Sequence, residues 1–311
     1  MLPFIAPPDY PLEAEWIAAL QAAMPQETVV PLAAMDEATR QRCEVAVVAN
    51  PRPEDLRRLP RLRWVHSVWA GVERLLAELG DLELQVVRLV DPQLADTMAE
   101  AVLAWTLYLH RDMPRYARQQ REGRWQPLDY VRPQHKTVGL LGLGALGSAA
   151  AARLVAAGFR VQGWSRTPHT LPGVICHAGD DGLARVLADS DMLVCLLPLT
   201  PQTRGLLNDA AFAQIKPGAA LINFARGAVV DDAALRRALD EGRLAHAVLD
   251  VFDVEPLPAD RWHWTHPAVT LLPHISAPTD RQTAARIVAT HIAAYRRNGV
   301  IPPHVDRARG Y

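Results

Sequence analysis

A glycine-rich junction restricts the fold of this chain more than any other part of it. Residues 137–158 read TVGLLGLGALGSAAAARLVAAG, an apolar strand, a tight turn and an alanine-rich helix. Three glycines follow a G-x-G-x-x-G pattern: the first permits the turn, the second lets a pyrophosphate approach the backbone, and the third lets helix and strand pack closely. Because free N–H groups at a helix start attract phosphates, this junction predicts a dinucleotide-binding βαβ unit. The residues expected to bind the phosphates are Gly142, Gly144, Ala145, Leu146 and Gly147.

The end of the next strand indicates which dinucleotide is bound. Residues 159–164 form an apolar strand, and Ser165, Arg166 and Thr167 follow it where such sites usually carry an acidic ribose-binding residue. An acid would repel a 2′-phosphate, whereas Arg166 attracts one and the two hydroxyls can donate to it. The sequence therefore predicts NADP(H), with NADPH preferred and NADH possible. The alternative is that Arg166 is an ordinary solvated surface arginine.

Composition bounds the class of protein. The chain has 311 residues, enough for two domains, and a net charge of −1 gives no electrostatic case for a nucleic-acid or membrane partner. Three widely spaced cysteines, Cys43, Cys176 and Cys195, favour a reducing compartment and argue against a disulfide framework. The N-terminus MLPFIAPPDY lacks the basic and apolar regions of a secretory signal, so we expect a cytoplasmic protein.

Strand-like and helix-like segments alternate along most of the chain. A long amphipathic segment near residues 96–125 is predicted to be helical for most of its length, and a final helix covers about 280–299. This alternation predicts an α/β fold with a doubly wound parallel sheet, and domain boundaries near residues 100 and 276. Beyond the long helix, strands are predicted near 137–142, 159–164, 191–196, 219–224, 246–251 and 269–272.

Three charged side chains follow predicted strands of this sheet. Arg226 stands between a strand and a helix, Glu255 lies in the loop beyond the next strand, and His274 follows the last one. Open α/β sheets bind ligands beyond the carboxyl ends of their strands, so these three residues are expected to converge. Taken singly, a lone arginine there is commonly a packing or capping group, and a lone histidine is more often structural than catalytic.

Several motifs, in order and spacing, resemble the D-isomer-specific 2-hydroxyacid dehydrogenase family. They are GLGALG, LPLTPQTRGLLN, NFARGAVVDDAAL, LDVFDVEPLP and PHISAPT; WSRT, WTHPAVTLLPHISAPT and the terminal VDRARGY further resemble its glyoxylate/hydroxypyruvate reductase A subgroup. The resemblance implies a Rossmann cofactor domain, residues 101–276, inserted into a smaller flavodoxin-like substrate domain built from residues 1–100 and 277–311. It also implies a homodimer and an NADPH-dependent reduction of small 2-keto acids.

The resemblance also assigns roles to individual residues. It implies that Asp250 orients the nicotinamide carboxamide with help from the backbone around Ala225. The loop VWAGVE resembles the cradle of the substrate carboxylate, which the family forms from backbone N–H groups. The residues implied for this cradle are Ala70, Gly71 and Val72, joined by Arg226, and those implied to line the cofactor are Leu197, Pro198 and Thr200.

The three charged residues suit the implied reaction. Arg226 can bind the carboxylate and polarise the carbonyl through its planar fork. His274, as imidazolium, can protonate the developing alkoxide while the nicotinamide delivers hydride. Glu255 beside it would hold the ring and favour its charged form. A formate-type dehydrogenase is disfavoured because that branch has glutamine where this chain has Glu255.

Other functions stay open at the level of sequence. One is a non-catalytic NADP sensor or corepressor on the same fold, and another is a reductase of a bulkier 2-keto acid. Residues 49–56, which by analogy edge the pocket, lack the aromatic side chain common in the reductase subgroup. His263 and His266 have no carboxylate or cysteine at a convincing ligand spacing, so no metal site is expected, and the neighbouring Trp262 and Trp264 are interpreted as packing residues.

Overall fold

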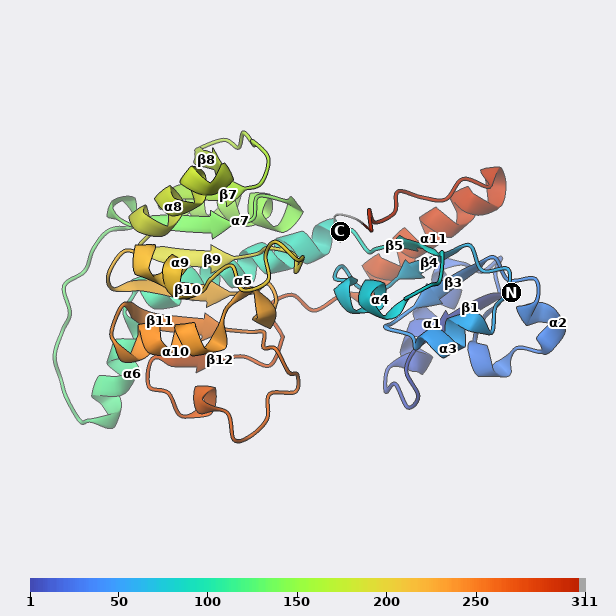
Figure 1. Cartoon of the computed structure of the whole chain (residues 1–311), viewed down its shortest axis with the longest axis horizontal. Coiled ribbons are helices and arrows are strands. Elements are labelled where there is room, and N and C mark those ends of the chain that lie inside the picture. Colours follow the sequence, from blue (N-terminus) through green and yellow to red (C-terminus); the bar gives the residue numbers. More distant parts are fainter. Residues whose placement is uncertain (308–311) are drawn as a thin grey trace. The chain divides into compact units, whose positions relative to one another are not determined.

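The computed structural model describes residues 1–307 and consists of two compact units (Figure 1). One unit comprises Met1–Gln93 and the described chain from Thr279 on, and the other comprises Leu94–Pro278. The first division precedes the expected one near residue 100, because helix α5 (Pro92–His110) already packs Met98 into the core of the second unit. Of the terminal motif VDRARGY, the last four residues, 308–311, lie outside the described residues.

The sheet of the first unit is parallel, with strand order β2-β1-β3-β4-β5. This is the flavodoxin-like order 2-1-3-4-5, so the structure confirms the expected fold class for this unit. Its strands are β1 (Leu2–Ile5), β2 (Val29–Pro31), β3 (Val45–Val48), β4 (Trp64–Ser67) and β5 (Gln85–Val87). Its α-helices are α1 (Glu13–Ala23), α2 (Glu37–Arg40), α3 (Pro53–Arg57), α4 (Glu73–Glu78) and α11 (Arg281–Asn298).

Helices cover both faces of this sheet because successive strand residues point to opposite sides and are apolar on both. On one face, Trp16 of α1 and Val288 of α11 pack with Val45 and Val47 of β3. On the other, the intervening residues of β3 pack against leucines of α3 and α4. Helix α11, last in sequence, thus completes a core begun by the N-terminal strands (Figure 1).

The sheet of the second unit is parallel with strand order β12-β11-β10-β9-β6-β7-β8. The order reverses between β6 and β9, which is where doubly wound sheets bind dinucleotides. Its strands are β6 (Thr137–Leu141), β7 (Arg160–Ser165), β8 (Val174–Ala178), β9 (Met192–Cys195), β10 (Ala219–Asn223), β11 (Leu244–Leu249) and β12 (Val269–Leu271). Its helices besides α5 are α6 (Met113–Arg121), α7 (Ala145–Ala156), α8 (Gly179–Asp189), α9 (Asp209–Gln214) and α10 (Asp232–Asp240).

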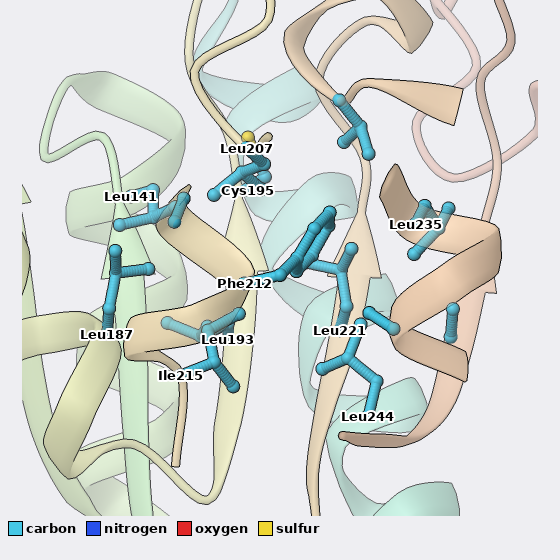
Figure 2. Close-up of a cluster of buried hydrophobic side chains, with 14 of the residues drawn as sticks. Leu141, Leu187, Leu193, Cys195, Leu207, Phe212, Ile215, Leu221, Leu235 and Leu244 are labelled. Atoms are coloured by element: carbon cyan, nitrogen blue, oxygen red, sulfur yellow. The ribbon is translucent and has the colours of Figure 1, made fainter. Parts of the chain in front are cut away.

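Alternation along the strands divides the side chains of this sheet between two apolar layers. Leu221 points into the layer formed with α8, α9 and α10, which Figure 2 shows, whereas Ile222 points into the layer formed with α5 and α7. In the first layer Phe212 of α9 fills the space between the sheet and Leu235 of α10. Both faces of the sheet are therefore closed, and ligands have access to its carboxyl-end loops.

Two local features were not predicted from the sequence. Strand β8 was missed, because an edge strand pairs on one side and leaves residues such as Ile175 exposed, which weakens the apolar signal. The long amphipathic segment is helical for most of its length, as predicted, but it is divided into α5 and α6: Asp112 adopts a left-handed conformation with φ of 54°, and Pro114 follows at the start of α6. A proline there starts a new helix rather than continuing the previous one.

Candidate active site

Three strand ends of the second unit bring the charged residues to one edge of the sheet. Arg226 follows β10, Glu255 lies in the loop after β11, and His274 follows β12, and these strands are neighbours in the sheet. Because the strands are parallel, their carboxyl ends share that edge. The fold therefore brings together residues that are distant in sequence.

His274 and Glu255 form a direct pair. His274 Nδ1 donates to Glu255 Oε2 over 2.7 Å, and Glu255 Oε1 accepts the backbone N–H of Phe252 over 2.9 Å. Both side chains are exposed, at 53% for His274 and 36% for Glu255, so other molecules can reach them. With Nδ1 committed to the carboxylate, Nε2 is the ring nitrogen that can transfer a proton to a bound molecule.

The pair shifts the pKa of each partner in the direction that favours its charged form. The hydrogen bond and the charge of Glu255 raise the pKa of His274 against partial burial and the repulsion of Arg226. Burial raises the pKa of Glu255, but the hydrogen bonds from His274 and the Phe252 N–H outweigh it, and the net shift is downward. The two groups titrate as a coupled unit whose singly protonated form is stabilised.

Asp250 holds the turn that carries His274. Its carboxylate is 2% exposed and accepts the backbone N–H groups of Ile275 over 2.7 Å and Ser276 over 2.9 Å. His274 itself adopts a left-handed backbone conformation with φ of 55°, which is uncommon outside glycine and persists where surrounding contacts enforce it. This positioning contact of Asp250 was missed from sequence, because its partners are backbone groups 25 residues away or more.

Arg226 lies half-buried between β10 and the short turn that follows it. Its Nη1 donates to the carbonyl of Ala225 over 2.7 Å, which holds the guanidinium beside the backbone of the preceding residue. The next residue, Gly227, has no room for a side chain, because a Cβ there would overlap the backbone of Phe252. The segments carrying Arg226 and Glu255 therefore pack against each other through bare backbone, and Arg226 contributes to the field at both Glu255 and His274.

The glycine-rich junction has the geometry of a phosphate loop. A Cβ at Gly147 would overlap the carbonyl oxygen of Gly142, so only glycine allows α7 to start this close to β6. At Gly144, which precedes the first residue of α7, a Cβ would meet no atom within 4 Å. That open space beside the helix start is where a pyrophosphate would approach the backbone, so the residues present fit a dinucleotide. Ala145 and Leu146 form the first turn of α7.

The predicted 2′-phosphate residues form a compact turn after β7. The Ser165 hydroxyl is buried and donates to the carbonyl of Thr167 over 2.7 Å, whereas Arg166 and Thr167 are exposed. The ring of His169, which sequence reasoning did not include, lies against this turn: its Nδ1 is 3.0 Å from Ser165 Oγ and 2.9 Å from the Thr167 carbonyl. His169 follows Ser165 by only four residues, and this short spacing is the signal by which the sequence could have identified it.

The remaining expected cofactor residues follow β9 and β10. Leu197 and Thr200 are buried, and Pro198 is half-buried. Thr203 Oγ1 accepts the Thr200 N–H over 2.8 Å and donates to the Pro198 carbonyl over 2.6 Å, which ties this loop together. Ala225, also buried, donates its N–H to Asn223 at the end of β10.

The expected carboxylate cradle belongs to the first unit. Ala70 and Gly71 are half-buried, and buried Val72 directly precedes α4. The N–H of Trp69 donates to the Ser67 hydroxyl over 3.0 Å, which turns the chain at the end of β4. The loop thus follows the carboxyl end of the parallel strand β4. In the same way, Arg226, Glu255 and His274 follow parallel strands of the other unit.

The described chain, residues 1–307, contains neither a membrane-spanning helix nor a metal-binding cluster of side chains. None of its helices combines the length and apolarity needed to cross a bilayer. No group of three or more His, Cys, Asp or Glu side chains within it is placed to hold a metal ion.

Comparison with known proteins identifies the family. Residues 103–276 match the family described as D-isomer specific 2-hydroxyacid dehydrogenase, NAD binding domain. Glyoxylate/hydroxypyruvate reductase A of Serratia proteamaculans is 39% identical over 303 residues, which are 96% of each chain.

Two solved structures extend this similarity to the whole fold. A D-isomer specific 2-hydroxyacid dehydrogenase from Xanthobacter autotrophicus Py2, in complex with NADPH and MES, is 40% identical with a TM-score of 0.93, covering 100% of this chain and 99% of that one. An NADPH-dependent glyoxylate/hydroxypyruvate reductase from Sinorhizobium meliloti, in complex with NADP and sulfate, is 35% identical with a TM-score of 0.87 and complete coverage of both. These findings confirm the resemblance seen in the motifs: the chain belongs to the D-isomer specific 2-hydroxyacid dehydrogenase family.

Proposed function

We propose that this protein is an NADPH-dependent reductase of small 2-keto acids, of the glyoxylate and hydroxypyruvate type. The observation that carries the proposal is the 2.7 Å pair of His274 and Glu255 at the strand-end edge that also carries Arg226. A proton donor and a fixed cation are what the reduction of a 2-keto acid needs from the protein. Relatives whose names carry this activity cover 96% of the chain.

In the proposed mechanism, each residue has a defined role in the reduction of the keto acid. The guanidinium of Arg226 binds the substrate carboxylate and polarises the ketone. The family resemblance implies the backbone N–H groups of residues 70–72, in the first unit, as donors to a substrate carboxylate. His274 donates the Nε2 proton to the developing alkoxide, and Glu255 stabilises the imidazolium before transfer. NADPH, when bound, supplies the hydride.

The cofactor is proposed to lie along the loops at the β6/β9 reversal. The N–H groups at the start of α7 would bind the pyrophosphate, and Arg166 with Ser165 and Thr167 would bind the 2′-phosphate. Solved relatives bound to NADPH or NADP, at 40% and 35% identity, support this choice of cofactor. The proposed nicotinamide contacts, Asp250 and the backbone of Ala225, belong to the same edge as His274. Leu197, Pro198 and Thr200 would line the cofactor from the loop after β9.

We also propose a cytoplasmic homodimer. The cysteines at 43, 176 and 195 are all free thiols, which suits a reducing compartment. Exposed apolar side chains gather in the segment around α6, including Met113, Tyr116 and Trp125, the last of which is 99% exposed. Exposed apolar side chains of this kind favour binding to a protein partner. The family resemblance implies that this partner is a second copy of the chain.

A panel assay tests the activity. Purified protein is mixed with NADPH or NADH and 2-keto acids of two to six carbons, and loss of the reduced-nicotinamide absorbance is followed. We expect reduction with NADPH, fastest for the smallest acids. Inactivity on the whole panel together with retained NADP binding would instead favour a non-catalytic sensor, and preference for the longer acids would favour a reductase of bulkier substrates.

Exchange of Ser165 for Asp together with Arg166 for Ala is expected to lower the preference for NADPH over NADH by about tenfold or more. An arginine–phosphate hydrogen bond contributes about 1.5–3 kcal/mol, and the new carboxylate repels the 2′-phosphate. The measurement is the ratio of kcat/KM for the two cofactors. Arg160→Ala, an exposed arginine at the opposite end of β7, is the matched control. An unchanged ratio in the double variant would mean that the 2′-phosphate is bound elsewhere.

Glu255→Gln is expected to move the alkaline limb of the reductive kcat/KM profile to lower pH. The hydrogen bond and charge of Glu255 raise the pKa of His274, so the acid stays protonated to higher pH in the wild type. Without the negative charge that pKa falls, and reductive activity is lost earlier as pH rises. Glu241→Gln, at the end of α10, is the control. A limb that does not move would show that His274 is not the titrating acid.

A further inference from the structure

A hydrogen-bonded cluster around the buried ring of His263 lies beside the loop that carries Glu255. Asp232, the first residue of α10, accepts two hydrogen bonds: from His263 Nε2 over 2.7 Å and from Trp262 Nε1 over 3.0 Å. The ring of His263 is 6% exposed and stacks on Trp262 at a centroid distance of 4.0 Å. One carboxylate therefore fixes the rings of Trp262 and His263 in the short turn at 262–264.

The cluster continues to the catalytic pair. His263 meets the ring of Phe252 edge to face, at a centroid distance of 5.3 Å and an interplanar angle of 82°. The backbone N–H of Phe252 donates to Glu255 Oε1 over 2.9 Å, and Glu255 Oε2 accepts from His274. An unbroken series of contacts thus runs from Asp232 to His274.

We infer that His263 and Asp232 are positioning residues, which hold the loop of Phe252 and Glu255 so that the Glu255 carboxylate stays on His274. This inference rests on the proposed function, in which that pair supplies the proton. Neither His263 nor Asp232 belongs to the set assigned above to substrate or cofactor. Their effect on the reaction passes entirely through the loop.

The loop needs such support because it is exposed and borders unfilled space. Glu255 is exposed, and a cavity of about 110 Å³ borders the loop, lined by Phe252, Val254, Leu257 and His263. Unfilled space beside a segment lets it shift, since the missing neighbours supply no packing contacts. The ring of His263 stands at this cavity and touches Phe252, so it limits that shift.

If packing were its only role, a histidine at position 263 would be less stabilising than an apolar side chain. Its Nδ1 is buried and has no hydrogen-bond partner among the described residues, an arrangement that destabilises a fold. A leucine would fill the same space without an unsatisfied polar atom. The hydrogen bond to Asp232 is what the histidine adds, and that bond fixes the angle at which the ring meets Phe252.

The charged groups around the His274–Glu255 pair and the His263–Asp232 pair determine how a measured pKa of His274 is interpreted. Arg226 and Asp250 act on His274 besides Glu255. On the Asp232 side, Arg261 and the loop residue Asp253 act on the Asp232 carboxylate, and Arg236 lies over the Trp262 ring at 5.9 Å. The proposed substitutions remove neither Arg226 nor Asp250, so a change in the titration of His274 reports the placement of Glu255.

The test is a titration of His274 by NMR in protein labelled with ¹³C-histidine, with His274→Ala assigning the resonance. For His263→Leu we expect the pKa of His274 to fall by about half a unit or more, because an opposite charge in contact shifts a pKa by roughly 1–3 units and part of that contact is lost. The alkaline limb of reductive kcat/KM should move equally, with kcat falling and KM nearly unchanged. His266→Leu is the control: His266 lies in the same segment and bonds Asp240 of α10 over 3.1 Å.

A second pair of variants covers the case in which His263→Leu does not fold. Asp232→Ala removes the acceptor at the start of α10, where the side chain is 38% exposed, and Asp240→Ala removes the corresponding acceptor at its end. We expect the first to lower the pKa of His274 and the second to leave it unchanged. A wild-type titration of His274 in both His263→Leu and Asp232→Ala, or in the one that folds, overturns the inference. Because the NMR readout needs no substrate, inactivity of the wild type would refute the proposed function separately.

Discussion

Replacing His274 by alanine is expected to lower kcat for 2-keto acid reduction by about 10²–10⁴-fold. General acid catalysis by a positioned side chain contributes a factor of this size, and His274 is the proton donor in the proposed mechanism. Single-turnover kinetics with NADPH and glyoxylate measures the effect on the chemical step. NADPH affinity, followed by its fluorescence, should stay near the wild-type value, because the phosphate loop lies after β6 and the substitution after β12.

The double variant with Glu255→Gln sharpens this prediction. If Glu255 acts only through His274, adding Glu255→Gln to His274→Ala should change kcat little further, so the two effects are not additive. Thr290→Ala, whose exposed hydroxyl donates to the Arg286 carbonyl within α11 of the first unit, serves as a substitution outside the substrate and cofactor residues. A His274→Ala enzyme with kcat within a few-fold of the wild type would remove His274 from the role of acid.

Replacing Arg226 by glutamine is expected to lower kcat/KM by about 10²-fold or more. A hydrogen bond to a charged group contributes about 1.5–3 kcal/mol, a bidentate arginine makes two, and each 1.4 kcal/mol is a factor of ten. Both KM and kcat should change, because the guanidinium binds the carboxylate and also stabilises charge on the ketone oxygen. Steady-state kinetics with glyoxylate over a wide concentration range separates the two.

Two further variants make the Arg226 prediction specific. Arg226→Lys keeps the charge but not the planar fork, so we expect a loss smaller than that of glutamine and still clearly measurable. Arg237→Gln, an exposed arginine of α10 that pairs with Asp209, is the control for removal of a positive charge from this unit. Equal kcat/KM in wild type and Arg226→Gln would contradict the carboxylate-binding role.

The fold class and the family could be predicted from sequence because their signals are local. The glycine pattern at 142–147 depends on turn geometry and close packing within one βαβ unit, which neighbouring residues specify. The alternation of strands and helices predicted the parallel sheets, and family motifs predicted the flavodoxin-like order of the other unit. Strand β8 and the break at Asp112 were missed because an exposed edge strand and a single left-handed residue leave weak traces in hydropathy.

For the site, the sequence predicted which types of residue follow the ends of strands, but it did not show how the fold places them. That Arg226, Glu255 and His274 share one edge follows from the order of β10, β11 and β12, and their catalytic roles remain predictions for the variants above to test. The hydroxyl of Ser165 illustrates the difference: its chemistry suits a phosphate, and the structure shows it donating to Thr167 within the turn.

Sequence by itself determined the family and predicted the phosphate loop and the residues of the candidate site, because each rests on short-range spacing or on residue chemistry. Only the tertiary structure decided how those residues are held. Asp250 grips the turn after His274 through backbone N–H groups, and Asp232 holds His263 against Phe252. The hydrogen bonds of Asp250 and Asp232 join residues 25 or more positions apart, and no local pattern encodes them. Any carboxylate could accept such hydrogen bonds, and only the folded chain selects which one does.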